Sequence, residues 1–280
     1  MVRSGVEISM GIHRIILFTL SVLIGSSAIA ADSDPLRMAS NTSTRSSGLL
    51  DVLVPAFQKA SDYKVELKVV GTGRALRLGR LGKVDIILVH APAYEQQFVE
   101  EGWGVERQTI MKNDFILVGP KADPAGIRGM QDAGEALKRV AETESMFASR
   151  GDDSGTHKKE LQCWSNVDIQ PAGSWYFEAG MPMGKTLKLA SDEQYYTIVD
   201  RGTWLKARKQ TKLDLLVEGD SKLDNPYSVI RINPARHKGI NYEGAKAFSD
   251  WLQSQEGRRL ILNHRVDGEQ LYFLPDVLQE

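Results

Sequence analysis

Residues 65–76 read VELKVVGTGRAL, and this stretch decides the fold class. The run VELKVV at 65–70 is rich in β-branched residues, as is typical of a strand, and the turn residues Gly71-Thr72-Gly73 separate it from a stretch that reads as a helix start. Outward in both directions, short apolar runs keep alternating with longer amphipathic segments. This alternation predicts an α/β protein with largely parallel sheets.

The same patterns place the other elements. Further strands are expected at 84–89, 115–118, 146–149, 196–199, 213–217 and 227–232. Helices are expected at 47–60, 92–102, 130–144, 155–166, 184–191, 243–253 and 256–264. Pro55 lies inside the first of these helices and should kink it or leave its first turns irregular.

Two segments are interpreted as crossings between lobes. Residues 113–120 and 225–234 each carry an apolar strand bounded by Asn or Pro. We therefore predict a discontinuous first lobe, residues 31–117 with 228–280, and a second lobe, residues 118–227. A chain divided in this way forms a cleft between its lobes.

The first 30 residues are predicted to be a cleavable signal peptide. His13-Arg14 precede an apolar run at 15–25, and Ala28-Ile29-Ala30 supplies small residues before a cleavage site after Ala30. The run is shorter than the roughly 20 residues of a membrane-spanning helix. We expect a periplasmic protein that is free rather than tethered, because no lipobox cysteine lies near Ala30.

Composition excludes several classes of partner and site. The 35 Lys and Arg residues nearly balance the 36 Asp and Glu residues, so no basic footprint for nucleic acid or anionic lipid is expected. The single cysteine, Cys163, excludes an intrachain disulfide and a cysteine-rich metal site. We expect its thiol to be buried and unreactive. No cofactor is predicted.

Three polar stretches carry the candidate chemistry, each between a predicted strand and a predicted helix start. They are residues 40–48, rich in hydroxyl groups, the Gly-Thr-Gly turn at 71–73, and RGDDSGT at 150–156. A helix start presents unpaired N–H groups and a partial positive charge, which stabilises an anion. Hydroxyl groups add donors, glycine allows close approach, and Arg150 offers a charged fork to two oxygens. The alternative is ordinary helix capping and turn formation.

Three neighbouring groups require separate interpretation. Asp152 and Asp153 have two possible roles. If one of them faces the ligand, it would favour a protonated oxyanion such as hydrogen phosphate. If they instead pair with Arg150 or cap the helix, they orient the site, and we favour this orienting role. His90 is interpreted as a structural donor rather than a ligand contact. Ser154 and His157 could instead act as nucleophile and base, but no Gly-x-Ser-x-Gly elbow surrounds the serine.

Taken together, the landmarks resemble the periplasmic tungstate-binding component of tungstate ABC transporters over nearly all of the mature chain. The resemblance is carried by residues 39–44, 48–51, 70–73, 84–85, 88–92, 113–115, 149–159, 200–203 and 225–227. It implies the type II periplasmic binding fold, with two α/β lobes, a cleft and two hinge crossings. It further implies a monomer that binds tungstate or molybdate without catalysis and delivers it to a membrane permease and its ATPase.

The resemblance also implies the ligand contacts, with the metal present only as the centre of the oxyanion. They are Ser40, Asn41, Thr42, Ser43, Thr72, Arg150, Ser154, Gly155 and Thr156. Asn41 departs from the threonine expected there, and Arg74 stands where a shorter polar or lysine side chain is expected; we expect Arg74 to face solvent. Three rivals stay open. A phosphate-binding protein of the same fold has a similar Arg-Asp-Ser-Gly-Thr stretch. An enzyme that uses Ser154 and His157 and a structural or adhesion module belong to other classes.

Overall fold

The computed structural model describes residues 1–2, 5 and 34–275. The predicted signal peptide falls almost wholly outside the described residues, so the structure does not bear on it. Residues 34–275 belong to one compact unit, which contains every helix and strand that the structure describes. No helix in this described part is long and apolar enough to span a bilayer.

The main sheet is built around two long strands, β4 (Gly104–Pro120) and β9 (Asp224–Ile232). Its strand order is β2-β1-β3-β9-β4-β7, and β8 also pairs with β4. The other strands of this sheet are β1 (Leu36–Asn41), β2 (Val65–Val70), β3 (Ile86–Val89), β7 (Thr197–Asp200) and β8 (Leu213–Val217).

The prediction of largely parallel sheets is wrong for the pairings of β4 and β9. β1 is parallel to β2 and β3, but β4 pairs antiparallel with β7, β8 and β9, and β9 is antiparallel to β3. The reason is topological: the chain leaves the first lobe along β4 and returns along β9, so these strands run in opposite directions. Outside this sheet are β5 (Phe147–Ser149), parallel to β6 (Tyr176–Glu178), and the hairpin β10 (Arg265–Val266) with β11 (Glu269–Gln270).

Helices cover the sheet at most of the predicted positions. They are α1 (Thr42–Ser47), α2 (Leu49–Ala60), α3 (Thr72–Arg80), α4 (Pro92–Glu100), α5 (Ala133–Glu142), α6 (Gly155–Ser165), α7 (Met183–Glu193), α8 (Arg201–Ala207), α9 (Tyr242–Gln253) and α10 (Gln255–Leu262). The short helix α8 and the hairpin of β10 and β11 were not predicted.

The helix predicted at 47–60 is irregular at a different residue from the one expected. Gly48 has φ 87°, a left-handed conformation that ends α1 and precedes α2. Pro55 lies inside α2, which continues through it to Ala60. The irregularity is therefore caused by the glycine seven residues earlier rather than by the proline ring.

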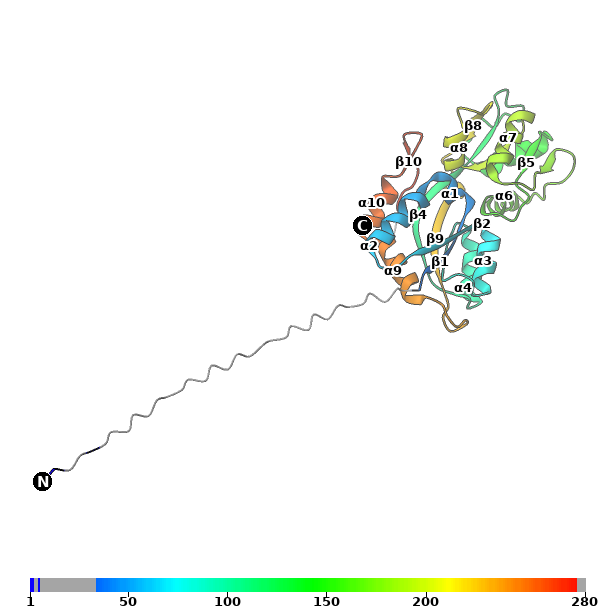
Figure 1. The fold of residues 1–280 in the computed structure, drawn as a ribbon. Helices are drawn as coiled ribbons and strands as arrows, with labels where there is room; N and C mark the ends of the chain where they lie inside the picture. Colours follow the sequence, from blue (N-terminus) through cyan, green and yellow to red (C-terminus); the bar gives the residue numbers. More distant parts are fainter. Residues whose placement is uncertain (3–4, 6–33, 276–280) are drawn as a thin grey trace. The chain divides into compact units, whose positions relative to one another are not determined.

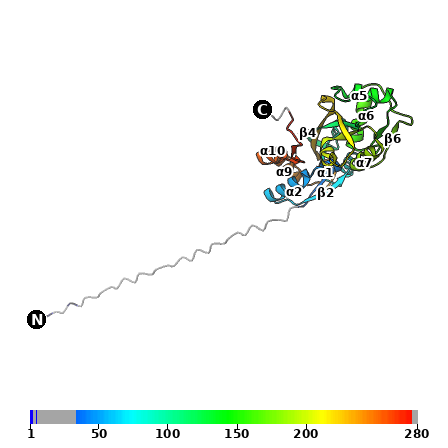
Figure 2. The ribbon, with the colours of Figure 1, turned by 90° about the horizontal axis from the view of Figure 1, so that it is seen from above.

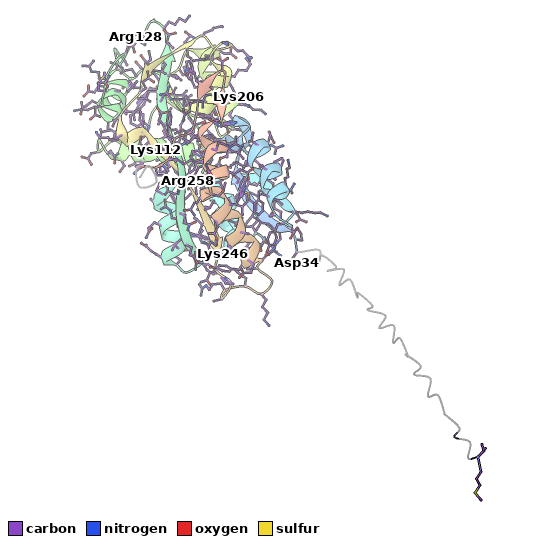
Figure 3. The ribbon with its side chains drawn as sticks, turned by 90° about the vertical axis from the view of Figure 1, so that its left-hand side faces the viewer. Asp34, Lys112, Arg128, Lys206, Lys246 and Arg258 are labelled. Carbon is purple, nitrogen blue, oxygen red and sulfur yellow. The ribbon has the colours of Figure 1, made fainter. Side chains whose placement is uncertain are left out.

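The chain ends share one lobe and the middle of the chain forms the other (Figure 1, blue to cyan and orange against green to yellow; Figure 2). In β4, residues 104–114 pair with β9, whereas residues 115–120 pair with β7 and β8. The change of partner thus precedes the boundary predicted at 117, and the boundary predicted at 227 falls inside β9. Figure 3 shows Arg128 and Lys246 at opposite ends of the two lobes, with Lys112 of β4 between them.

One buried carboxylate ties the first lobe together. Asp85 is 0% exposed and accepts from the backbone N–H of Arg37, at 2.8 Å, and from that of Asn241, at 2.9 Å. The Arg37 guanidinium binds the same carboxylate. Since Arg37 lies in β1, Asp85 directly precedes β3 and Asn241 caps α9, this side chain joins three elements that are distant in sequence.

We expect Asp85→Ala to lower the free energy of unfolding by about 2–4 kcal/mol, because it leaves buried donors and a guanidinium without their acceptor. Urea denaturation measures this loss. The control is Asp192→Ala, which removes an exposed carboxylate paired with Lys188 and should leave the free energy of unfolding nearly unchanged. Equal effects of the two substitutions would contradict the assignment.

Candidate functional site

The candidate site lies where the parallel strands of the first lobe end. Asn41 of β1 is level with Val70 of β2, and Ser40 is level with Leu88 of β3. The segments that follow these strands therefore begin at one edge of the sheet. They bring together the start of α1, the Gly-Thr-Gly turn at 71–73, and His90.

The third predicted loop meets these segments from the other lobe. A Cβ placed on Gly73 would clash with the carboxylate of Asp153, and one placed on Gly155 would lie 2.8 Å from the ring of His90. Glycine at 155 thus allows the lobes to approach closely beside the buried His90 ring, whereas at 73 the Asp153 carboxylate, at the end of a flexible side chain, could shift aside. The structure brings together the three polar stretches that the sequence singled out.

Four predicted site residues carry buried polar atoms without a hydrogen-bond partner among the described residues. These atoms are Nδ2 of Asn41, Oγ1 of Thr72, Nε of Arg150 and Oγ1 of Thr156. Both threonines are 0% exposed and Arg150 is 3% exposed. Leaving a buried donor unsatisfied costs roughly 1–3 kcal/mol. Several such atoms at one place indicate a binding site for a ligand with several acceptor oxygens.

Asn41 presents its amide NH₂ because its oxygen is already engaged. Asn41 Oδ1 caps α1 by accepting from the backbone N–H of Thr44 at 2.8 Å and from Thr44 Oγ1 at 2.8 Å. This fixes the orientation of the amide, so Nδ2 is the group that stays available. The departure from threonine at this position thus preserves a donor.

The Arg150 guanidinium is held on one side by Asp152. Arg150 Nη2 pairs with Asp152 Oδ2, and Asp152 Oδ1 accepts from the backbone N–H of Ser154 at 3.2 Å. The predicted orienting role is therefore confirmed for Asp152. Asp153 pairs with Lys158 rather than with Arg150. Both carboxylates have cationic partners, and Nε of Arg150 is left for a ligand.

A second carboxylate, that of Glu160, is hydrogen-bonded to the backbone of Arg150. Glu160, on α6, is 0% exposed and accepts from the Tyr176 hydroxyl at 2.6 Å and from the backbone N–H of Arg150 at 3.3 Å. Burial raises the pKa of Glu160 to about 7. Sequence reasoning missed this residue; the available signal was an acidic side chain on the helix face that also holds Cys163 and Trp164.

The start of α6 supports binding rather than nucleophilic catalysis. Ser154 is the N-cap and accepts from the backbone N–H of His157 at 3.2 Å. The ring atom Nδ1 of His157 accepts from the backbone N–H of Asp153 at 3.1 Å. The serine and the imidazole are thus each engaged with loop backbone. Gly155 and Thr156 follow as the first residues of α6, both buried.

The remaining predicted contacts have the following surroundings. The Ser40 hydroxyl donates to the carbonyl oxygen of Leu88 at 2.9 Å, so its hydrogen is used within the sheet, and Ser40 stays a predicted ligand contact. Thr42 and Ser43 line a cavity of about 230 Å³ that α7 and α8 also line. Arg74 is exposed, as expected.

A hydrogen-bonded relay connects His90 to both crossing strands. Asn225 donates through Nδ2 to Asn113 Oδ1 at 2.7 Å and to the Tyr227 hydroxyl at 3.2 Å. Asn225 Oδ1 therefore faces His90 Nδ1, 2.7 Å away, and accepts from it. The predicted structural role of His90 is confirmed. The pKa of His90 is lowered to about 4, chiefly by burial.

Asn113 ends this relay with a further available donor. Its Nδ2 is buried and has no partner within the part of the chain that the structure describes. From the sequence, Asn113 and Asn225 were interpreted as turn formers that bound the crossings and as part of the family resemblance, but not as ligand contacts. Their pairing follows from the register of β4 and β9, in which the two residues lie opposite each other.

The described residues show neither a reactive thiol nor a group of side chains arranged to hold a metal ion. Cys163 is 3% exposed, as predicted, and burial raises the pKa of its thiol to about 11. Among residues 34–275, no group of three or more His, Cys, Asp and Glu side chains is arranged to hold a metal ion.

Comparison with known proteins agrees with this geometry. A family model described as "PBP superfamily domain" matches residues 26–256. The tungstate-binding protein TupA of Peptoclostridium acidaminophilum is 47% identical over 240 residues, which cover 85% of this chain and 83% of that protein.

Two solved structures are similar over most of their length. The tungstate-binding protein TupA from Desulfovibrio alaskensis G20 is 40% identical, with a TM-score of 0.77 over 86% of this chain and 99% of that chain. The tungstate ABC transporter structure from Geobacter sulfurreducens is 44% identical, with a TM-score of 0.74 over 82% of this chain and 99% of that chain.

The buried, neutral His90 predicts an acid-sensitive contribution to stability. The pKa of His90 is about 4 in the folded state and near the ordinary value of 6.5 in the unfolded chain. Between pH 6.5 and pH 4, the imidazole is therefore protonated in the unfolded chain but not in the folded protein. The contribution is intact above pH 6.5 and is lost as the pH falls towards 4. Between pH 7 and pH 4.5, this histidine should account for a loss of about 2–3 kcal/mol in the free energy of unfolding.

Urea unfolding at both pH values, compared with His90→Gln, measures this loss. The variant keeps a side-chain donor for Asn225 but has no titrating imidazole, so its stability should fall less on acidification. Equal acid sensitivity in both proteins would contradict the assignment.

Proposed function

The chain belongs to the PBP superfamily and to its tungstate-binding branch, and from that premise we propose that it binds tungstate in the cleft between its lobes for an ABC importer. We propose molybdate as a second ligand, because it is also a tetrahedral dianion of similar size. The chain is a binding protein and not an enzyme, and the proposal requires no cofactor.

One observation supports the ligand class most directly: the unpartnered atoms at the site are suited to donate. Asn41 Nδ2, Asn113 Nδ2 and Arg150 Nε can only donate, and the hydroxyls of Thr72 and Thr156 can do so by rotation. A fully deprotonated oxyanion offers acceptors on every oxygen, which suits such a set.

Phosphate suits the same set less well. At neutral pH inorganic phosphate carries one or two hydroxyl hydrogens, and each such hydrogen needs an acceptor. The nearby carboxylates of Asp152 and Asp153 are paired with Arg150 and Lys158. The relatives reported above are named for tungstate. Sulfate is fully deprotonated too, and we propose that its shorter bonds to oxygen exclude it by size.

Binding should proceed by closure of the lobes. Donors from the first lobe, on Asn41 and Thr72, and from the second, on Arg150 and Thr156, are all satisfied only when both lobes surround the ion. Bending of β4 and β9 at the crossings would open and close the cleft. The ligand then favours the closed arrangement by its differential affinity for the two states.

The importer supplies the setting. We propose that the protein acts as a monomer outside the cytoplasm, in the periplasm, after removal of its signal peptide. The closed lobes would be recognised by the membrane permease, and the ATPase of the importer would drive release.

Calorimetric titration should show tight 1:1 binding of tungstate and molybdate. Arg150→Ala should weaken tungstate binding about 30-fold or more, and Thr72→Val about tenfold or more, because each removes a donor to a charged oxygen. The control Arg139→Ala changes an exposed arginine on α5 of the same lobe as Arg150 and should leave affinity unchanged.

The same titration with sulfate and phosphate tests the rival. Both ions should bind far more weakly than tungstate. Phosphate binding as tight as tungstate binding would favour a phosphate-binding protein. An unchanged tungstate affinity in Arg150→Ala would contradict the assignment of Arg150 to the binding site.

A further inference from the structure

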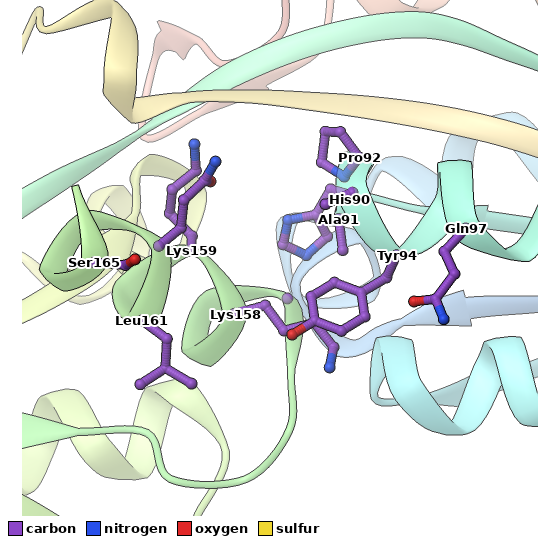
Figure 4. A pocket seen from close by; sticks show the side chains of 12 residues that line it. His90, Ala91, Pro92, Tyr94, Gln97, Lys158, Lys159, Leu161 and Ser165 are labelled. Carbon is purple, nitrogen blue, oxygen red and sulfur yellow. The ribbon is translucent and has the colours of Figure 1, made fainter. Parts of the chain in front are cut away.

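A lysine from one lobe rests on a tyrosine from the other beside the oxyanion site. Lys158 Nζ lies 3.7 Å from the centre of the Tyr94 ring (Figure 4). Tyr94 is on α4 of the first lobe, and Lys158 is on α6 of the second. The Lys158 side chain is only 8% exposed. The side chain of its partner Asp153 is 66% exposed, so this ion pair borders solvent.

The same ammonium is also bound by Asp153. Lys158 Nζ pairs with Asp153 Oδ1, while Asp153 Oδ2 lies against Gly73 of the first lobe. Asp153 has φ 57°, a left-handed conformation that is uncommon for a residue with a side chain. Its carboxylate thus occupies one side of the ammonium, and the Tyr94 ring occupies another.

These contacts lie outside the set of unpartnered donors. Neither Tyr94, Lys158 nor Asp153 carries a buried unpartnered atom in the described structure. Tyr94 and Lys158 themselves line a cavity of about 490 Å³ between α4 and α6, together with His90, Gly155 and Leu161, among others. The stack is therefore a local contact between lobes, with space beside it, rather than one part of a continuous packed interface.

We propose that Tyr94, Lys158 and Asp153 form a latch between the lobes that slows release of the bound oxyanion without contacting it. This inference rests on the proposed function. Opening the cleft separates the ammonium from the ring but leaves it paired with Asp153, since both residues belong to the third loop and α6. The ring contact therefore stabilises the closed lobes selectively, because the cation faces the ring only when the lobes are closed.

The consequence is kinetic. An interaction that forms only on closure lowers the rate of opening, and release depends on opening. We therefore expect its loss to raise the dissociation rate and to leave the association rate nearly unchanged. Substitution of Tyr94 is the informative change, because it removes the ring without altering the charge around the anion.

Stopped-flow measurement of tungstate binding tests the latch. Tyr94→Leu should raise the dissociation rate about three- to tenfold, whereas Tyr94→Phe, which keeps the aromatic face, should stay within about twofold of the wild type. In a Lys158→Met background, Tyr94→Leu should have no further effect. Equal tungstate dissociation rates for Tyr94→Leu and the wild type would overturn the latch. It would also be overturned if Tyr94→Leu raised the dissociation rate equally in the wild-type and Lys158→Met backgrounds.

A second readout does not depend on tungstate release. The ε-methylene protons of Lys158 should show an upfield ring-current shift in NMR spectra, recorded with and without tungstate, that disappears in Tyr94→Leu. No such shift in either sample would overturn the latch. A shift together with no tungstate binding by the wild type would overturn the proposed function and leave the latch contact standing.

Discussion

The structure depends on one constraint: polar donors are buried at the meeting of two lobes without protein acceptors. Nε of Arg150 and the hydroxyls of Thr72 and Thr156 find no partner among the described residues. In a low-dielectric environment such atoms are costly unless a ligand satisfies them. Folding retains this cost at the site between the lobes, where an oxyanion can satisfy several of these donors at once.

Internal acceptors prepare these donors for the ligand. Asn41 Oδ1 is held by Thr44, Asp152 holds one edge of the Arg150 guanidinium, and Glu160 accepts from the Arg150 backbone. Each polar group therefore has one end fixed by the protein and the other available. Because the orientations are set before the anion arrives, less conformational freedom is lost on binding.

The sequence anticipated the local features better than the long-range ones. The strands at 65–70 and 213–217, and the helix beginning at Gly155, depend on β-branched runs and capping residues that are visible in a few neighbouring positions. The relay from His90 to Asn225 joins residues 135 positions apart, and the pair Asn225 and Asn113 is 112 positions apart. Only the register of β4 and β9 creates these contacts, and no local pattern reveals it.

The Nε–H group of Arg150 gives a ¹⁵N–¹H NMR signal that reports the hydrogen-bond partner of this one buried donor. On addition of tungstate, the resonance should move downfield and its exchange with water should slow, because the nitrogen gains a charged acceptor. The Nε–H signal of the exposed Arg139 should stay in place. An Arg150 signal that is unchanged at saturating tungstate would contradict the claim that the buried donors are completed by the oxyanion.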